Sequence, residues 1–190
     1  MATITAFESI TLDGVVQAPA RPDEDSRGAF PYGGWAVPYQ DASTAPFSGD
    51  GKDAGMLFGH RTYDDVLGYW TFTTDPNPFT ARLTNAKKYV VTRDPDARLA
   101  FPNSQPLTDE AMVTVAQLKR ELDGTLTVLG SGELVRSLLA AALVDTLVLL
   151  IHPLVLGTGI RLFGDTRTEL DLRRSVTSDT GVVIAEYALQ

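Results

Sequence analysis

The stretch Val128-Leu129-Gly130-Ser131-Gly132-Glu133-Leu134 indicates the fold of this chain most directly. It ends an apolar, strand-like run that begins at Leu126, and it leads into a helix that we expect to extend through Ala142. A strand that turns through glycine into a helix leaves backbone N–H groups pointing outward at the positive end of the helix dipole. Such a turn can bind a phosphate. An ordinary tight strand-to-helix turn is the alternative interpretation.

The turn does not complete the dinucleotide-binding motif of a Rossmann domain. The pattern G-x-G-x-x-G needs a third glycine where Val135 stands, and the turn comes late in the chain. Gly132 is expected to serve ligand binding more than folding, because a side chain there would hold a phosphate away from the backbone.

The segments on either side of this turn predict strands that alternate with helices. Apolar or alternating runs predict strands at Thr3–Ser9, Ala54–Gly59, Lys87–Arg93, Leu147–Val155, Leu170–Thr177 and Val182–Leu189. Helical spacing predicts helices at Thr62–Tyr69 and Glu110–Leu122, the second capped by Asp109. This alternation indicates an α/β fold, with a mixed, mainly parallel sheet flanked by helices and an antiparallel C-terminal hairpin. We expect residues 1–190 to form a single domain.

A Pro-, Gly- and Asp-rich stretch, residues 17–51, separates the first two predicted strands. A linker between domains would have this composition, but only one short strand precedes it. The aromatic residues of the stretch need a surface to pack against, which disfavours disorder. Long loops inside compact domains are usually functional, so we interpret residues 17–51 as a long active-site loop.

The composition of the chain limits its ligands. Its 190 residues include 24 acidic and 16 basic side chains, which give a net charge of −8. Nucleic acids and anionic membranes attract positively charged surfaces, so neither is an expected partner. Two histidines and no cysteine leave too few soft ligands for a zinc site and exclude thiol catalysis. With no cysteine and no basic, apolar leader, a cytoplasmic location without a metal site is expected.

Two further strand ends carry residue types that bind anions. Gly59-His60-Arg61-Thr62-Tyr63 follows one predicted strand and opens a helix, and Thr92-Arg93 ends another. Ligands of open α/β sheets bind at the carboxyl ends of the strands. Each segment alone also fits a solvated helix start, a helix cap or an exposed turn. Together with the glycine turn they favour a site for an anionic ligand, whose positive charge we expect from Arg61, Arg93 and one of Lys87 and Lys88.

In their order and spacing, these segments resemble the dihydrofolate-reductase-like fold. They are most similar to the reductase domain of the bifunctional riboflavin-biosynthesis deaminase-reductase and to its stand-alone relatives. The resemblance covers nearly the whole chain and implies a three-layer fold. It rests on Ser9-Ile-Thr-Leu-Asp-Gly14, Gly59-His-Arg-Thr-Tyr63, Tyr89-Val-Val-Thr-Arg93, Gly130-Ser-Gly-Glu-Leu134, Leu143-Val-Asp-Thr-Leu147, His152-Pro-Leu-Val-Leu-Gly157 and Leu162-Phe163.

The resemblance implies a reductase that transfers a hydride from NADPH to a small heterocyclic substrate of the pyrimidine ribosylamine or pterin type. The glycine turn would bind the pyrophosphate of the cofactor, and Thr92 and Arg93 its adenosine 2′-phosphate. His60 stands where the family often has Arg or Lys, so this phosphate contact would pass to Arg61. The implied cofactor-binding residues are Asp13, Gly14, Gly59, His60, Arg61, Thr62, Thr92, Arg93, Gly130, Ser131, Gly132, Glu133 and Leu134.

The catalytic candidate also comes from the resemblance. In dihydrofolate reductases a Trp-x-x-Pro segment precedes a carboxylate that anchors the pterin and helps to protonate it. Trp35-Ala-Val-Pro38 is present here, and Asp41 follows one residue later than expected. Helix capping or simple exposure is the alternative role for Asp41. A true dihydrofolate reductase and a non-catalytic nucleotide-binding module are the competing functions. Homodimers are common in the resembling family, and the apolar run 147–156 is a candidate interface.

Overall fold

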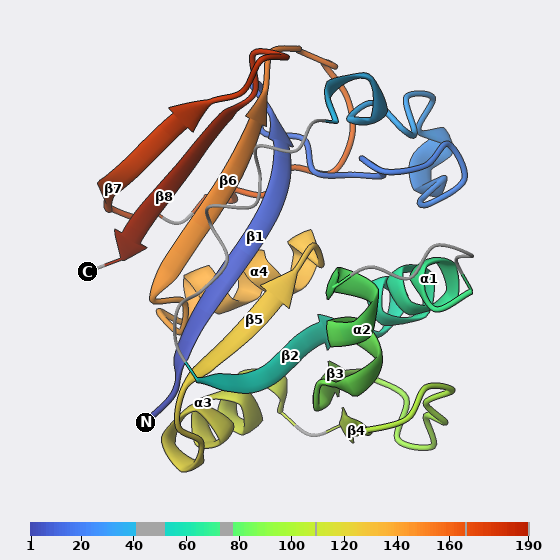
Figure 1. Cartoon of the computed structure of the whole chain (residues 1–190), viewed down its shortest axis with the longest axis vertical. Helices are drawn as coiled ribbons and strands as arrows, with labels where there is room; N and C mark the ends of the chain where they lie inside the picture. The colour runs from blue at the N-terminus through green and yellow to red at the C-terminus, as the bar shows by residue number, and fades with distance from the viewer. Residues whose placement is uncertain (41–51, 73–77, 109, 166, 190) are drawn as a thin grey trace.

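The computed structural model describes residues 1–40, 52–72, 78–108, 110–165 and 167–189. Its centre is an eight-stranded sheet in the order β4-β3-β2-β5-β1-β6-β8-β7 (Figure 1). Neighbouring strands from β4 to β6 in this order run parallel, and β8 pairs antiparallel with β6 and β7. The strands are β1 (Thr3–Thr11), β2 (Asp53–Gly59), β3 (Lys88–Val91), β4 (Ser104–Leu107), β5 (Thr125–Leu129), β6 (Thr146–His152), β7 (Leu170–Thr177) and β8 (Val183–Leu189).

Helices cover both faces of the sheet, which confirms the predicted α/β fold (Figure 1). The pleat of β2 shows the two faces, because successive residues of a strand point to opposite sides. Met56 and Phe58 pack with α1 (His60–Trp70) and α2 (Pro78–Asn85). Leu57 packs into the larger core beneath α3 (Ala111–Glu121) and α4 (Gly132–Ala140). None of the helices within the described residues is long and apolar enough to cross a membrane.

Two observed elements, β4 and α2, are not predicted from the sequence. β4 is an edge strand with exposed Gln105 and Pro106, so it lacks the apolar pattern of a buried strand. Proline has no N–H group to donate. It is tolerated in an edge strand because some residues there have no neighbouring strand to pair with. α2 begins with Pro78, which suits the first position of a helix, and its apolar face is narrow, with Leu83 fully buried.

Several boundaries differ from the predicted ones. α1 begins at His60, two residues earlier than expected, so Thr62 lies within the first turn of the helix and does not cap it. Asp109, the predicted cap of α3, lies outside the described residues. β6 ends at His152 because proline follows. β6 pairs on both sides, and its residues 147–149 are buried in the core, whereas Leu150 and Ile151 are half-buried, so the dimer interface stays a prediction.

The described part of the long loop, residues 17–40, packs as an ordered segment beside the carboxyl end of β1. Phe30 and Trp35 are buried in a small core of their own, and the Trp35 indole N–H donates to the backbone carbonyl of Gln17 at 2.7 Å. Arg21 binds Asp65 of α1 through two guanidinium nitrogens. The described part of the loop is therefore held against α1 and is not a free linker.

Lys88 does not contribute positive charge to a site at the strand ends, contrary to one expectation from the sequence. It opens β3, at the end of the strand opposite to Thr92 and Arg93. The side chain is fully buried, and its ammonium donates to the backbone carbonyls of Leu83, Thr84 and Ala86 at 2.8, 3.2 and 2.8 Å. Burial lowers the pKa of Lys88. This lysine closes the end of α2 and has a structural role.

Replacement of Lys88 by Met leaves the carbonyls at the end of α2 without their donor. We expect the free energy of unfolding to fall by about 2–4 kcal/mol, because buried acceptors are costly to leave unpaired. The measurement is urea denaturation. Lys87→Met changes the exposed neighbouring lysine and should cost less than about 0.5 kcal/mol. Equal losses for the two variants would contradict the structural role.

Candidate active site

The structure brings the three predicted strand ends together at one edge of the sheet. The backbone N–H of Gly59, at the end of β2, donates to the Ser131 hydroxyl at 3.1 Å. The His60 ring nitrogen Nδ1 and the Thr92 hydroxyl are hydrogen-bonded at 3.1 Å. Contacts between side chains and backbone therefore connect the ends of β2, β3 and β5, as their parallel pairing predicts.

The glycine turn has the conformation that the sequence indicates. Gly130 and Ser131 both have left-handed backbone angles, with φ of 58° and 67°, and α4 begins directly after them. The Gly130 N–H donates to the carbonyl of Phe7 in β1 at 3.0 Å. Glu133 is exposed, whereas Leu134 is buried in the core, so Leu134 offers a ligand only its backbone.

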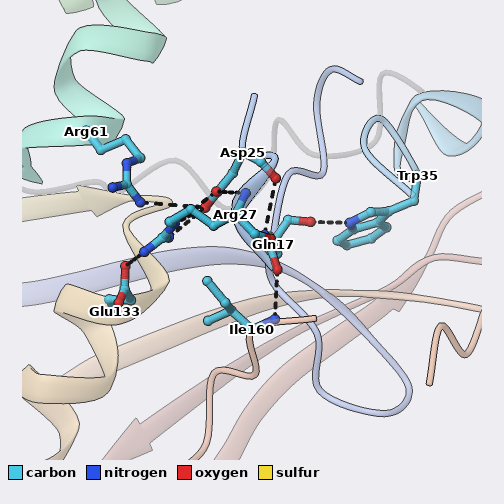
Figure 2. Close-up of polar contacts among 7 residues, drawn as sticks. All are labelled: Gln17, Asp25, Arg27, Trp35, Arg61, Glu133 and Ile160. Atoms are coloured by element: carbon cyan, nitrogen blue, oxygen red, sulfur yellow. Dashed lines mark hydrogen bonds and ion pairs between the residues drawn. The ribbon is translucent and has the colours of Figure 1, made fainter. Parts of the chain in front are cut away.

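An arginine that sequence reasoning did not identify lies at this turn (Figure 2). Arg27, from the long loop, binds Glu133 of α4 at 2.7 Å and Asp25 through its Nε and Nη2 atoms. Arg61 of α1 lies 3.9 Å from the same Asp25 carboxylate. The hydrogen bonds between Arg27 and Asp25 lower the pKa of the Asp25 carboxyl and raise the pKa of the Arg27 guanidinium, so this pair is charged at neutral pH. Two guanidinium groups thus lie beside the N-terminus of α4.

Gln17 holds this part of the loop in place (Figure 2). Its buried side-chain amide donates to the carbonyls of Asp25 and Arg27 at 3.2 and 3.0 Å. The amide oxygen accepts from the Ile160 N–H at 3.0 Å. Every hydrogen-bonding group of the side chain except one lone pair is used. A buried glutamine within a proline-rich stretch gives no motif in the sequence, which is why neither Gln17 nor Arg27 was predicted.

Gly132 has a packing role in addition to the ligand-binding role expected from the sequence, which stays a prediction. A Cβ atom at Gly132 would lie 2.6 Å from Cγ2 of Val16, a buried residue directly before the loop. Real Cβ atoms do not approach other atoms so closely, so a side chain here displaces Val16 before it meets any ligand. Gly59 differs, because the nearest atoms to its Cβ position belong to Ser131 at 3.8 Å.

Asp13 connects the end of β1 to the segment after β6 through hydrogen bonds to its carboxylate. Its carboxylate accepts from the Thr11 hydroxyl at 2.6 Å and from the backbone N–H groups of Leu156 and Gly157 at 3.2 and 2.8 Å. These hydrogen bonds, that of Thr11 first, lower the pKa of Asp13 to about 2. Asp13 and Gly14 also line a shallow, largely apolar cavity of about 480 Å³ near Ile10 and Ile151.

Two predicted site residues remain, Arg93 and Asp41. Arg93 is exposed directly after β3, at the same edge as Arg61. Asp41, the catalytic candidate, lies outside the described residues. The aromatic segment just before it is described, and Trp35 and Tyr39 both meet the ring of His152 edge-on, with centroids 5.0 and 5.6 Å apart. Burial lowers the pKa of His152, whose Nδ1 is hydrogen-bonded to the carbonyl of Leu150.

Known proteins share the sequence pattern and the fold of this chain. A model of the RibD C-terminal domain family matches residues 2–184. The uncharacterized protein YwjB of Bacillus subtilis (strain 168) is 30% identical over 148 residues, which are 73% of this chain and 79% of YwjB.

Among the solved structures that match the whole chain are two that bear on its fold. One is a protein from Shewanella sp. PV-4 assigned to riboflavin biosynthesis, with a TM-score of 0.67, 16% identity and 99% of its own length covered. The other is a pyrimidine reductase-like protein from Corynebacterium diphtheriae NCTC, with a TM-score of 0.65, 12% identity and 92% of its length covered. At these identities the likeness confirms the dihydrofolate-reductase-like fold alone.

The contact between Gly132 and Val16 can be tested by a pair of substitutions. Gly132→Ala should destabilise the protein by about 1–3 kcal/mol, as overpacking does. Adding Val16→Ala removes the methyl groups that meet the new Cβ, so the double variant should lose less than the sum of the single losses. Gly59→Ala is the matched control and should change the melting temperature little. Strictly additive losses in thermal unfolding would contradict the contact.

The hydrogen bonds to Asp13 make a pH-dependent contribution to stability. The lowered pKa means that this contribution is present above about pH 4 and is lost as the pH falls towards 2. Asp13→Asn should therefore lower the melting temperature at neutral pH, and the difference from the parent should shrink in acid. Asp179→Asn, in the exposed β7–β8 turn, serves as control. If the difference in melting temperature stays constant across this pH range, the hydrogen bonds to Asp13 do not make the expected contribution to stability.

Proposed function

Because this chain belongs to the RibD C-terminal domain family, we propose that it is a reductase that uses NADPH to reduce a small heterocyclic substrate. The observation that carries the proposal is the meeting of three strand ends with the guanidinium groups of Arg27 and Arg61. This arrangement places two guanidinium groups, paired with carboxylates that an entering anion can replace, at one edge of a chain whose net charge is −8. A dinucleotide phosphate needs such local compensation in an acidic protein.

The residues at this edge fit the phosphate groups of a dinucleotide. The outward N–H groups of the first turn of α4 and the Ser131 hydroxyl would bind the pyrophosphate. Arg27 would neutralise its charge, with the anion taking contacts that Glu133 and Asp25 now occupy. Arg61 and Arg93, with Thr92 beside Arg93, would bind the 2′-phosphate, since guanidinium matches phosphate oxygens in pairs.

Resemblance to reductases of riboflavin biosynthesis supports a pyrimidine ribosylamine or a pterin as the substrate class. The half-buried aromatic ring of Tyr39 beside the end of β6 suits a flat heterocycle, and buried Trp35 supports it from the core of the loop. The cofactor supplies the hydride, and the protein orients the reactants and excludes water. Asp41, next to this aromatic segment, is proposed to anchor the substrate or deliver a proton.

The proposed phosphate contacts predict a preference for NADPH over NADH. Losing one charge-assisted hydrogen bond costs about 1.5–3 kcal/mol, or roughly tenfold to a hundredfold in affinity. Arg93→Ala and Arg61→Ala should each weaken NADPH binding by about this factor and NADH binding much less. Titration of tryptophan fluorescence at fixed ionic strength measures both affinities. Arg173→Ala removes an exposed arginine on β7 and should leave both unchanged.

Three results would contradict parts of this proposal. Equal affinity of the parent for NADPH and NADH would reject the 2′-phosphate assignment. Equal losses of the two dinucleotides in both arginine variants would reject the named residues. Tight NADPH binding without substrate-dependent loss of its absorbance, across pyrimidine and pterin substrates, would favour a non-catalytic nucleotide-binding module.

A further inference from the structure

Glu8 of β1 is a buried acid without a hydrogen-bond partner for one of its oxygens. Its side chain is only 3% exposed, and Oε1 contacts no donor among the described residues. Ile4, Ala6 and Ile10, on the same face of β1, all belong to the apolar core. A carboxyl group at this position costs folding free energy, because burial without hydrogen bonds is unfavourable for a polar group. Such a cost suggests a role in binding a ligand.

The position of Glu8 in the sheet connects it to the candidate site. β1 and β5 pair only as far as Phe7 and Leu129, and the Phe7 carbonyl then accepts the Gly130 N–H of the glycine turn. β1 continues alongside β6 to Thr11 (Figure 1). Glu8 is therefore the first residue of β1 beyond the end of β5. It lies where the two strands separate, one residue from the turn that would hold the pyrophosphate.

The surroundings favour the neutral form of the Glu8 carboxyl. Burial raises its pKa well above the usual value, and the negative charge of Glu24 in the long loop raises it further. Leu149, its neighbour in register on β6, and Gly130 at the turn carry no charge. The charged groups at the start of α4, Arg27 and Glu133, are paired with each other. Glu8 is thus a carboxylic acid that can donate one hydrogen bond and can lose one proton.

We infer that the Glu8 carboxyl contacts the nicotinamide end of the bound cofactor, as a neutral acid against the reduced ring and as a carboxylate against the oxidised ring. The inference rests on the proposed function. The dihydronicotinamide ring is uncharged, and a neutral acid can hydrogen-bond to its carboxamide. The oxidised ring is a cation, which favours an anion beside it in a buried site. The O–H bond of Glu8 then breaks, and the proton passes to solvent.

This difference between the two redox forms can be measured without any substrate. Calorimetric titration of the parent with NADP⁺ and with NADPH, in buffers of different ionisation enthalpy, gives the number of protons released on binding. At a pH below the pKa of Glu8, NADP⁺ should release up to about one proton more than NADPH. The 2′-phosphate is common to both ligands, so its own titration cancels. The affinity of NADP⁺ relative to NADPH should rise up to about tenfold per pH unit in this range.

Two isosteric variants test whether the proton released on NADP⁺ binding comes from Glu8. Glu8→Gln keeps the shape of the side chain but has no proton to release, so the difference between NADP⁺ and NADPH should vanish while both still bind. Glu24→Gln makes the same chemical change in the loop and should retain the difference, with its midpoint at lower pH because a neighbouring negative charge is gone. If Glu8→Gln does not fold, the measurement on the parent still decides.

The outcomes separate this inference from the proposed function. Equal proton release for the two dinucleotides, over about pH 5–8, overturns the inference and leaves an NADPH-binding protein in place. A difference that persists in Glu8→Gln but is lost in Glu24→Gln overturns the assignment to Glu8. Failure of the parent to bind either dinucleotide contradicts the proposed function itself, and the inference with it.

Discussion

The early end of the pairing between β1 and β5 determines the arrangement of the candidate site. After Phe7 and Leu129 the two strands separate, because Gly130 and Ser131 adopt left-handed angles and turn the chain out of the sheet into α4. The separation leaves the second half of β1 open on one side. The start of α4, the first turn of α1 and the loop after β1 all meet at this opening. Ligand sites in open α/β sheets have the same origin, a divergence of neighbouring strands at their carboxyl ends.

The arginines of the candidate site come from distant parts of an acidic chain. Arg61 comes from α1, whereas Arg27 comes from a loop that Gln17 fixes through three hydrogen bonds of its buried amide. Gly132 belongs to the same construction, since the lack of a side chain allows Val16 to pack against the start of α4. The loop is therefore part of the site wall, and its position depends on packing as much as on charge.

The sequence predicts the elements whose signals are local, and it misses those that depend on tertiary contacts. Apolar runs and glycine turns identified seven of the eight strands, β4 being the exception, and the edge at which the predicted strand ends meet. Gln17 and Arg27 carry no motif, and their roles depend on folding of the loop against α1 and α4. Glu8, in contrast, is marked in the sequence itself by its position in the first strand. It occupies the core-facing phase of an alternating strand, between Ala6 and Ile10, where a carboxylate is out of place.

The charges around Arg27 have a consequence for the thermodynamics of ligand binding. Asp25 and Glu133 already satisfy the guanidinium groups, so the two arginines and two carboxylates sum to zero before any ligand arrives. An entering phosphate replaces carboxylates and does not meet bare cations, so association is an exchange of counter-ions supplied by the protein. Added salt screens the old pairs as well as the new ones. Affinity should consequently decline less steeply with ionic strength than two unpaired arginines would give, while the displaced carboxylates gain freedom as they return to water.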